Sequence, residues 1–169
     1  MPVIAWSEPD EVFATDACLT GAGGVIHGDV RAFYHAEFPT SVTKLQLHIH
    51  QLELLAIVVG VKLWAQSLVG QKVLIQCDNE PSVFALNSGR TRDGSGFVGR
   101  CLRELWLICS LSQIELRAIH IAGVNNRQPD WLSRWHLDSH FGELFYESIS
   151  GFYIEEVIFN AYFDLNDKF

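Results

Sequence analysis

Four acidic residues lie where an isolated charge is costly, and together they suggest metal chemistry. Asp16 interrupts the apolar run VFATDA, and Asp78 closes the apolar run KVLIQCD. Glu53 lies in the otherwise apolar segment LELLAIV, and Asp130 lies near the start of a short polar segment. Removing a carboxylate from water without a partner costs several kcal/mol, and Mg²⁺ prefers oxygen ligands. These residue types therefore favour a site with paired divalent ions, of the kind that hydrolyses phosphodiesters.

The predicted elements bring the acids together. Apolar runs bounded by glycine-containing turns predict three strands, over 12–18, 22–27 and 30–36, as an antiparallel meander. A long helix follows over 48–68, and the continuous apolar run over 72–78 is typical of a buried strand. If the strands 12–18 and 72–78 are parallel neighbours, Asp16 and Asp78 lie side by side. Both then stand at strand ends, where sites in α/β sheets form.

The rest of the chain completes the fold class. We expect helices over 79–89 and 97–111, a strand over 113–121, and a short helix within 123–135 that begins at an asparagine cap. The order of elements predicts an α/β protein with a mixed five-stranded sheet flanked by helices. We expect one domain over 1–136. Residues 137–169 show no clear period and are rich in aromatic and acidic residues, so we expect a C-terminal extension there.

Composition and charge limit the classes of protein. The net charge of −8 argues against a free-standing nucleic-acid binder that relies on charge alone. The four cysteines form no CxxC pair and are expected to be reduced core residues, which favours an intracellular protein, cytoplasmic or nuclear. The longest apolar run, 52–65, contains Glu53 and Lys62 and is too short to span a bilayer, so no membrane association is expected.

Four motifs resemble the ribonuclease H domain of retroelement reverse transcriptases. They are TDACLTGAG (15–23), HQLELLA (50–56), CDNEPSV (77–83) and HIAGVNNRQPDWLSR (120–134), so the resemblance covers about residues 10–136. The last motif is most similar to that of DIRS-like tyrosine-recombinase and Ty3/gypsy-like elements. The resemblance implies a ribonuclease H-like fold that hydrolyses the RNA strand of an RNA–DNA hybrid with two Mg²⁺ ions, for which Mn²⁺ substitutes. The implied partners are the hybrid and the polymerase domain of the same polyprotein.

The resemblance also assigns roles to individual residues. Asp16 would bridge both metal ions, Asp130 would hold the ion that activates the attacking water, and Glu53 and Asp78 would complete the other. His120 stands where the family carries a histidine, or in some retroelements a tyrosine, that assists proton movement or product release. The residues implied to contact the substrate are Gly21, Gly23, His50, Asn79, Arg90 and Arg92.

Departures from the family pattern keep two alternatives open. The family often carries asparagine three or four residues before the helix glutamate, where this chain has His50 and Ile49. Some members carry glutamine two residues after the strand-end aspartate, where this chain has Glu80, an acid that would face a polyanion. One alternative is therefore a catalytically silent ribonuclease H-fold connection or interaction module. The other is a different nuclease or transposase of the same superfamily, such as the integrases, which place a glutamate where this chain has Asp130.

Overall fold

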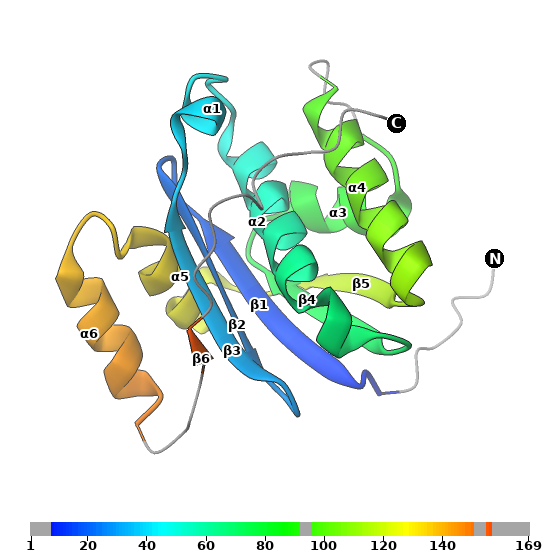
Figure 1. Ribbon diagram of the computed structural model, residues 1–169. Helices are drawn as coiled ribbons and strands as arrows, with labels where there is room; N and C mark the ends of the chain where they lie inside the picture. The colour runs from blue at the N-terminus through cyan, green and yellow to red at the C-terminus, as the bar shows by residue number, and fades with distance from the viewer. Residues whose placement is uncertain (1–7, 92–95, 151–154, 157–169) are drawn as a thin grey trace.

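A mixed sheet lies between two layers of helices in the computed structural model, which describes residues 8–91, 96–150 and 155–156 (Figure 1). The strands are β1 (Glu11–Ala17), β2 (Gly21–His27), β3 (Arg31–Glu37), β4 (Lys72–Cys77), β5 (Glu115–His120) and β6 (Glu155–Glu156), in the order β5-β4-β1-β2-β3-β6. β1, β2 and β3 pair as the predicted antiparallel meander, and β4 is parallel to β1 and β5. The predicted α/β fold is confirmed, and the structure adds the two-residue strand β6 to the five predicted strands.

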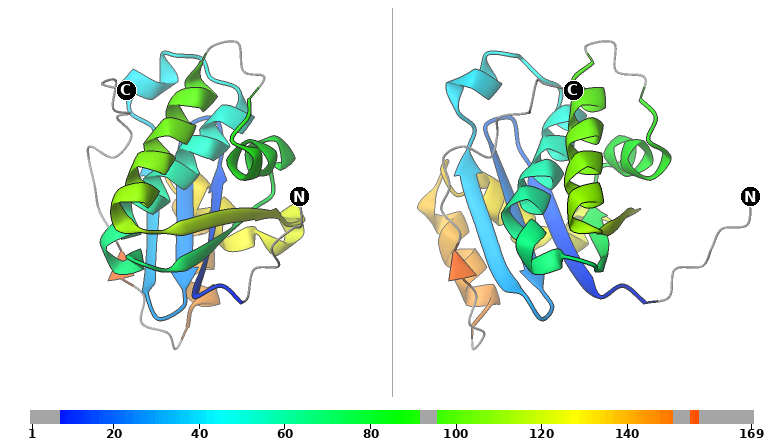
Figure 2. Two further views of the ribbon diagram at one scale, coloured as in Figure 1. Left: turned by 90° about the vertical axis from the view of Figure 1, so that its right-hand side faces the viewer. Right: turned by 45° about the vertical axis from the view of Figure 1, so that its right-hand side comes forward.

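The helices divide between the two faces of the sheet. They are α1 (Thr40–Thr43), α2 (Ile49–Trp64), α3 (Glu80–Ser88), α4 (Phe97–Ser112), α5 (Arg127–Arg134) and α6 (Ser139–Ser148), with 3₁₀ turns η1 (Ala65–Leu68) and η2 (Gly123–Asn125). Figures 1 and 2 show α2 and α4 over one face, α3 beside them towards β5, and α5 and α6 over the other face. The Asn87 side-chain amide bonds to both the N–H and the carbonyl of Ala118, which ties α3 to the sheet edge.

Helix α2 is the centre of the core because apolar residues surround its axis. Every residue from 51 to 61 is buried, and Phe13 of β1 packs edge-on against Trp64 with ring centroids 5.2 Å apart. The helical stretch Ile49–Leu68 has the length and composition to cross a membrane. The apolar run 52–65, which the sequence analysis judged too short to span a bilayer, is only part of this helical stretch. However, 72% of its apolar window is buried inside the protein. The core of this domain therefore accounts for the apolar character of the helix.

The parallel pairing of β1 and β4 determines where the first and third acids lie. The register pairs Ala14 with Gln76, and two residues further along the chain lie Asp16, inside β1, and Asp78, directly after β4. β2, β3 and α2 lie between the two strands in sequence and form the crossover connection, as predicted. The two acids therefore leave the same end of adjacent strands.

The chain after residue 136 contains structure that the sequence pattern did not predict. Ser139–Ser148 form α6, which begins at Asp138, whose side chain accepts a hydrogen bond from the His140 N–H at 2.9 Å. Phe145 and Ile149 are buried against Val25 and Phe33. Of the aromatic segment 152–165, all but β6 lies outside the described residues. The boundary at residue 136 stays a prediction.

Candidate active site

The four predicted acids line one open cleft of about 800 Å³ at the end of the sheet. Asp16 comes from β1, Glu53 from α2, Asp78 from the residue after β4, and Asp130 from α5. The side chains of Asp16 and Glu53 are buried, with residue exposures of 5% and 3%. Asp78 and Asp130 are partly exposed. The cleft thus has two acids at its base and two that reach solvent.

The two acids at the base of the cleft hold their protons more tightly than exposed acids do, because burial raises their pKa values. Burial, and to a smaller extent the charges of Asp78 and Asp130, together raise the pKa of Asp16 to about 7, although a hydrogen bond with Glu53 lowers it. Burial, followed by the charge of Asp16, raises the pKa of Glu53 to about 11. Four oxygen donors, two of them buried with raised pKa values, fit a hard divalent cation, which would favour their charged forms.

Helix α5 positions this cleft through side chains to which the sequence analysis gave no role. Ser133 Oγ lies 2.8 Å from the Asp130 carbonyl oxygen and 3.4 Å from Asp16 Oδ2, so its one hydrogen is shared between these two acceptors. Arg134 Nε donates to Asp130 Oδ1 at 2.8 Å. Asn126 is the N-cap residue of α5, as predicted, but its side chain does not cap the helix, because its Nδ2 donates to the Thr15 carbonyl at 3.0 Å. The motif GVNNRQPDWLSR contained these residues, but a sequence alone does not show which strand they meet.

Two glycines predicted to contact substrate lie beneath α5. Gly21 and Gly23 are both buried. A Cβ at Gly23 would lie 2.8 Å from the backbone of Leu132, and one at Gly21 would lie 2.6 Å from the Ser133 carbonyl oxygen. The close packing of α5 on β2 accounts for glycine at both positions. Their contact with a substrate stays a prediction.

His120 and Asn79 lie beside Asp78. The His120 ring, at the end of β5, has Nε2 3.2 Å from the Asp78 carbonyl oxygen and Nδ1 3.9 Å from Glu80 Oε1, so it lies at the rim of the cleft. Asn79 lines the cleft and is the N-cap residue of α3. Its Oδ1 accepts hydrogen bonds from the N–H and the hydroxyl of Ser82. The asparagine therefore fixes the start of α3 next to the third acid.

The remaining predicted substrate contacts lie elsewhere. His50 and Arg90 line a separate hollow of about 460 Å³ between α2, α3 and the start of α4, together with Glu80 and the exposed ring of Phe84. Arg92 lies outside the described residues. The acidic cleft and this hollow are therefore distinct surfaces. Glu80 lines the hollow, and its Oε1 lies 3.9 Å from His120 Nδ1.

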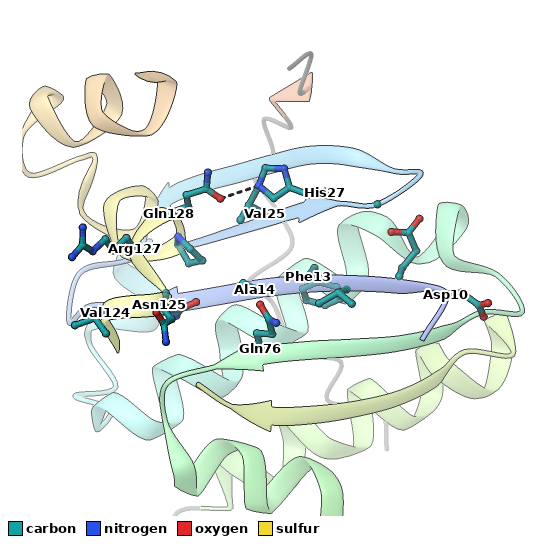
Figure 3. A pocket seen from close by; sticks show the side chains of 15 residues that line it. Asp10, Phe13, Ala14, Val25, His27, Gln76, Val124, Asn125, Arg127 and Gln128 are labelled. Carbon is teal, nitrogen blue, oxygen red and sulfur yellow. Dashed lines mark hydrogen bonds between the residues drawn. The ribbon is translucent and has the colours of Figure 1, made fainter. Parts of the chain in front are cut away.

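A further hollow, of about 560 Å³, lies on the face of the sheet near the start of α5 (Figure 3). There His27 and Gln128 face each other, with Nε2 and Oε1 2.8 Å apart. Its two acids already bind backbone groups, because Asp10 accepts from the first N–H of β4 and Glu11 accepts from two N–H groups of the β2–β3 turn. This hollow contains none of the predicted site residues that the structure describes, and its acids serve the fold.

Comparisons with known proteins agree with the fold. The family described as the RNase H-like domain found in reverse transcriptase matches residues 8–105, which include Asp16, Glu53 and Asp78. The segment with Asp130 lies beyond the matched residues, so its place in the cleft rests on the structure. Among curated proteins, none matches this sequence.

Three solved structures show the same fold. RNase H1 from the halophilic archaeon Halobacterium salinarum NRC-1 is 12% identical, with a TM-score of 0.59 over 79% of this chain and 99% of that one. The N-terminal RNase H domain of a Mycobacterium tuberculosis protein, solved as a fusion with maltose binding protein, is 11% identical, with a TM-score of 0.58 over 81% and 99%. LC11-RNase H1 in complex with an RNA/DNA hybrid is 16% identical, with a TM-score of 0.51 over 72% and 92%. The chain belongs to the family of RNase H-like domains found in reverse transcriptases.

Proposed function

We propose that this domain is a metal-dependent endonuclease that hydrolyses the RNA strand of RNA–DNA hybrids during retroelement reverse transcription. The observation that carries the proposal is the convergence of Asp16, Glu53, Asp78 and Asp130 from four separate elements in one cleft. The family supports it, and so does a structural neighbour crystallised with an RNA/DNA hybrid. The DIRS-like or Ty3/gypsy-like lineage and the intracellular setting belong to the same proposal.

The four carboxyl groups would hold two Mg²⁺ ions, or Mn²⁺ in their place. Such ions, when bound, stabilise the charge that develops on the phosphate and favour the attacking hydroxide. Asp16 is the acid that interacts with the other three, through a hydrogen bond with Glu53 and the charges of Asp78 and Asp130. It is therefore suited to be the ligand that both ions share.

The chain's own residues prepare the cleft for this chemistry. Ser133 holds the Asp16 carboxylate from α5, and Arg134 holds Asp130. His120 lies beside the third acid, with its Nε2 3.2 Å from the Asp78 carbonyl oxygen and its Nδ1 3.9 Å from Glu80 Oε1. His50 and Arg90 line a hollow in which a nucleic-acid backbone could be held.

The charge of the domain bears on its partners. A net charge of −8 gives little general attraction for a polyanion, and binding of nucleic acid depends mainly on basic side chains. We therefore include the polymerase domain of the same polyprotein in the proposal, as the part that provides most of the affinity for the hybrid.

The test is cleavage of an RNA–DNA hybrid with each strand labelled, in Mg²⁺ and in Mn²⁺. Asp78→Asn removes one acid of the cleft, and Asp29→Asn is the matched control because Asp29 is exposed in the β2–β3 turn. We expect cleavage of the RNA strand alone, reduced at least about a hundredfold by Asp78→Asn and unchanged by Asp29→Asn.

Absence of cleavage in both metals by folded protein would contradict an autonomous nuclease. Repeating the assay with the polymerase domain present then separates two cases. Restored cleavage would show that the isolated domain binds the hybrid too weakly. Continued inactivity would favour the catalytically silent module, in which the Arg134 guanidinium, and not a metal ion, neutralises Asp130.

A further inference from the structure

A buried thiol lies next to Glu53, one of the two buried acids of the cleft. Cys77 is the last residue of β4 and is fully buried, on the face of the strand that packs against α2. Its Sγ lies 3.9 Å from Glu53 Oε2. One ligand atom each from Glu53, Cys77 and Asp78 lies within 4.8 Å of the other two. Two of the four acids therefore share their immediate surroundings with a sulfur atom.

We propose that Glu53, Cys77 and Asp78 form a binding site for thiophilic divalent ions, Zn²⁺ and Cd²⁺, at the base of the cleft. An ion held there would use two carboxylates that the hard ions also need, so it would block the cleft. The binding site rests on the three side chains alone. Its inhibitory consequence rests on the proposed nuclease function.

The three ligands match the coordination chemistry of zinc. A tetrahedral Zn²⁺ has a Zn–S distance of about 2.3 Å and Zn–O distances of about 2.0–2.2 Å, which places its ligand atoms about 3.5 Å apart. The three atoms here lie within 4.8 Å of one another, so on binding they must approach each other by up to about 1.3 Å. Three protein ligands leave a fourth position for water, on the side where the cleft opens to solvent.

The sulfur atom makes the site selective among metals. Mg²⁺ binds oxygen ligands and does not compete for a thiolate, whereas Zn²⁺ and Cd²⁺ bind thiolate strongly. Burial raises the pKa of the Cys77 thiol, so the free protein holds it protonated. The bound cation takes the electron pair of sulfur and the proton leaves to solvent, because a coordinating thiol is deprotonated outright.

The other three cysteines provide matched controls. Cys18 lines the mouth of the same cleft, but its Sγ faces the Ser133 carbonyl oxygen at 3.2 Å. Cys101 and Cys109 lie on α4. All four are free thiols. The proposal assigns thiophilic ions to Cys77 and to none of the others.

The test is a titration of metal-free protein with CdCl₂, without nucleic acid, followed by the ultraviolet charge-transfer absorption of the Cd–thiolate bond. We expect a band that saturates with the wild type, disappears in Cys77→Ser, and persists in Cys18→Ser and Cys109→Ser. Calorimetry should show at least about a tenfold loss of Cd²⁺ affinity in Cys77→Ser. Absence of the band in the wild type, or its persistence in Cys77→Ser, would overturn the proposal.

A second variant keeps the test valid if Cys77→Ser does not fold. The triple variant Cys18→Ser, Cys101→Ser, Cys109→Ser leaves Cys77 as the only thiol and must still show the band. Glu53→Gln in that background should weaken Cd²⁺ binding at least about tenfold. Loss of the band in the triple variant would refute the assignment to Cys77.

The two proposals fail separately. A domain that cleaves the hybrid in Mg²⁺ but shows no Cd–thiolate band refutes the thiophilic site alone. A domain that shows the band but does not cleave refutes the nuclease function alone. If both hold, micromolar Zn²⁺ should inhibit Mg²⁺-supported cleavage by the wild type, and Cys77→Ser should require at least about ten times more Zn²⁺ for the same inhibition.

Discussion

The carboxyl groups of Asp16 and Glu53 are hydrogen-bonded to each other although both are acids. Such a bond requires one proton between the two groups, since two carboxylates offer only acceptors. Asp16 is on a strand and Glu53 on a helix, so the bond joins the sheet to the core helix at the base of the cleft. In the metal-free protein this proton reduces the charge that a divalent ion would otherwise neutralise.

Metal binding should therefore release a proton. We expect Mn²⁺ or Mg²⁺ to displace about one proton per chain near neutral pH, because both carboxylates must be charged to act as ligands. Calorimetric titration in buffers of different ionisation enthalpy measures the number released. Glu53→Gln removes the group whose pKa is about 11 and should reduce the number. Binding heats that are identical in all buffers would contradict a shared proton.

The stability of the metal-free protein should fall as pH rises. The pKa of Asp16 is about 7 in the folded protein against an ordinary value of 3.8. Between about pH 4 and pH 7 the folded state thus holds more protons at Asp16 than the unfolded chain does, so Asp16 alone lowers the free energy of unfolding by up to about 1.4 kcal/mol per pH unit. Urea unfolding with a chelator present, at several pH values, measures this slope.

Asp16→Asn is the variant that isolates this effect. It removes the titrating group, so the slope over the same pH range should become smaller, with only the contribution of Glu53 remaining. Mg²⁺ should restore stability to the wild type at pH 7 and much less to Asp16→Asn. Equal slopes for the two proteins would show that Asp16 does not titrate in this range.

The sequence predicts correctly the element on which an acid lies when the acid is part of a regular apolar run. The apolar runs around Asp16 and Asp78 placed both acids at the ends of buried strands, and the parallel pairing of those strands follows from the crossover that lies between them. The density of apolar residues around Glu53 likewise identified the core helix.

Long-range contacts could not be predicted in this way. The hydrogen bond from Asn126 joins it to Thr15, 111 residues away, and that from Ser133 reaches Asp16, 117 residues away. Nothing in the local pattern around either residue indicates which strand it meets. The asparagine was read as a helix cap for that reason, since the local role of an asparagine before a helix is to cap it.

The packing of α5 should be sensitive to Gly23. A methyl group there would lie 2.8 Å from the backbone of Leu132, so α5, and Asp130 with it, must move away from β2. We expect Gly23→Ala to lower the free energy of unfolding by about 1–3 kcal/mol, the usual cost of overpacking, and to weaken Mg²⁺ binding. Denaturant unfolding and calorimetry measure the two effects.

Gly99→Ala is the control for this substitution. Gly99 lies inside α4, and a methyl group there would meet only the flexible end of Arg103, at 3.4 Å. Alanine is the better helix former, so this change should raise stability by roughly 0.5–1 kcal/mol and leave metal binding unchanged. A Gly23→Ala protein as stable as wild type would mean that α5 can shift without cost.

Phe145 tests whether α6 belongs to the domain or is an appendage after residue 136. Its side chain is fully buried, and its ring lies 4.7 Å from that of Phe33 of β3. We expect Phe145→Ala to cost about 3–5 kcal/mol in denaturant unfolding, since the cavity would lie between α6 and the sheet. Leu111→Ala, at a residue 77% exposed, should change stability by less than about 0.5 kcal/mol. If Phe145→Ala costs less than about 1 kcal/mol, α6 is detachable and the predicted boundary at 136 is correct; a cost in the expected range moves the end of the folded domain to α6, because burial of that size requires the helix to unfold together with β3.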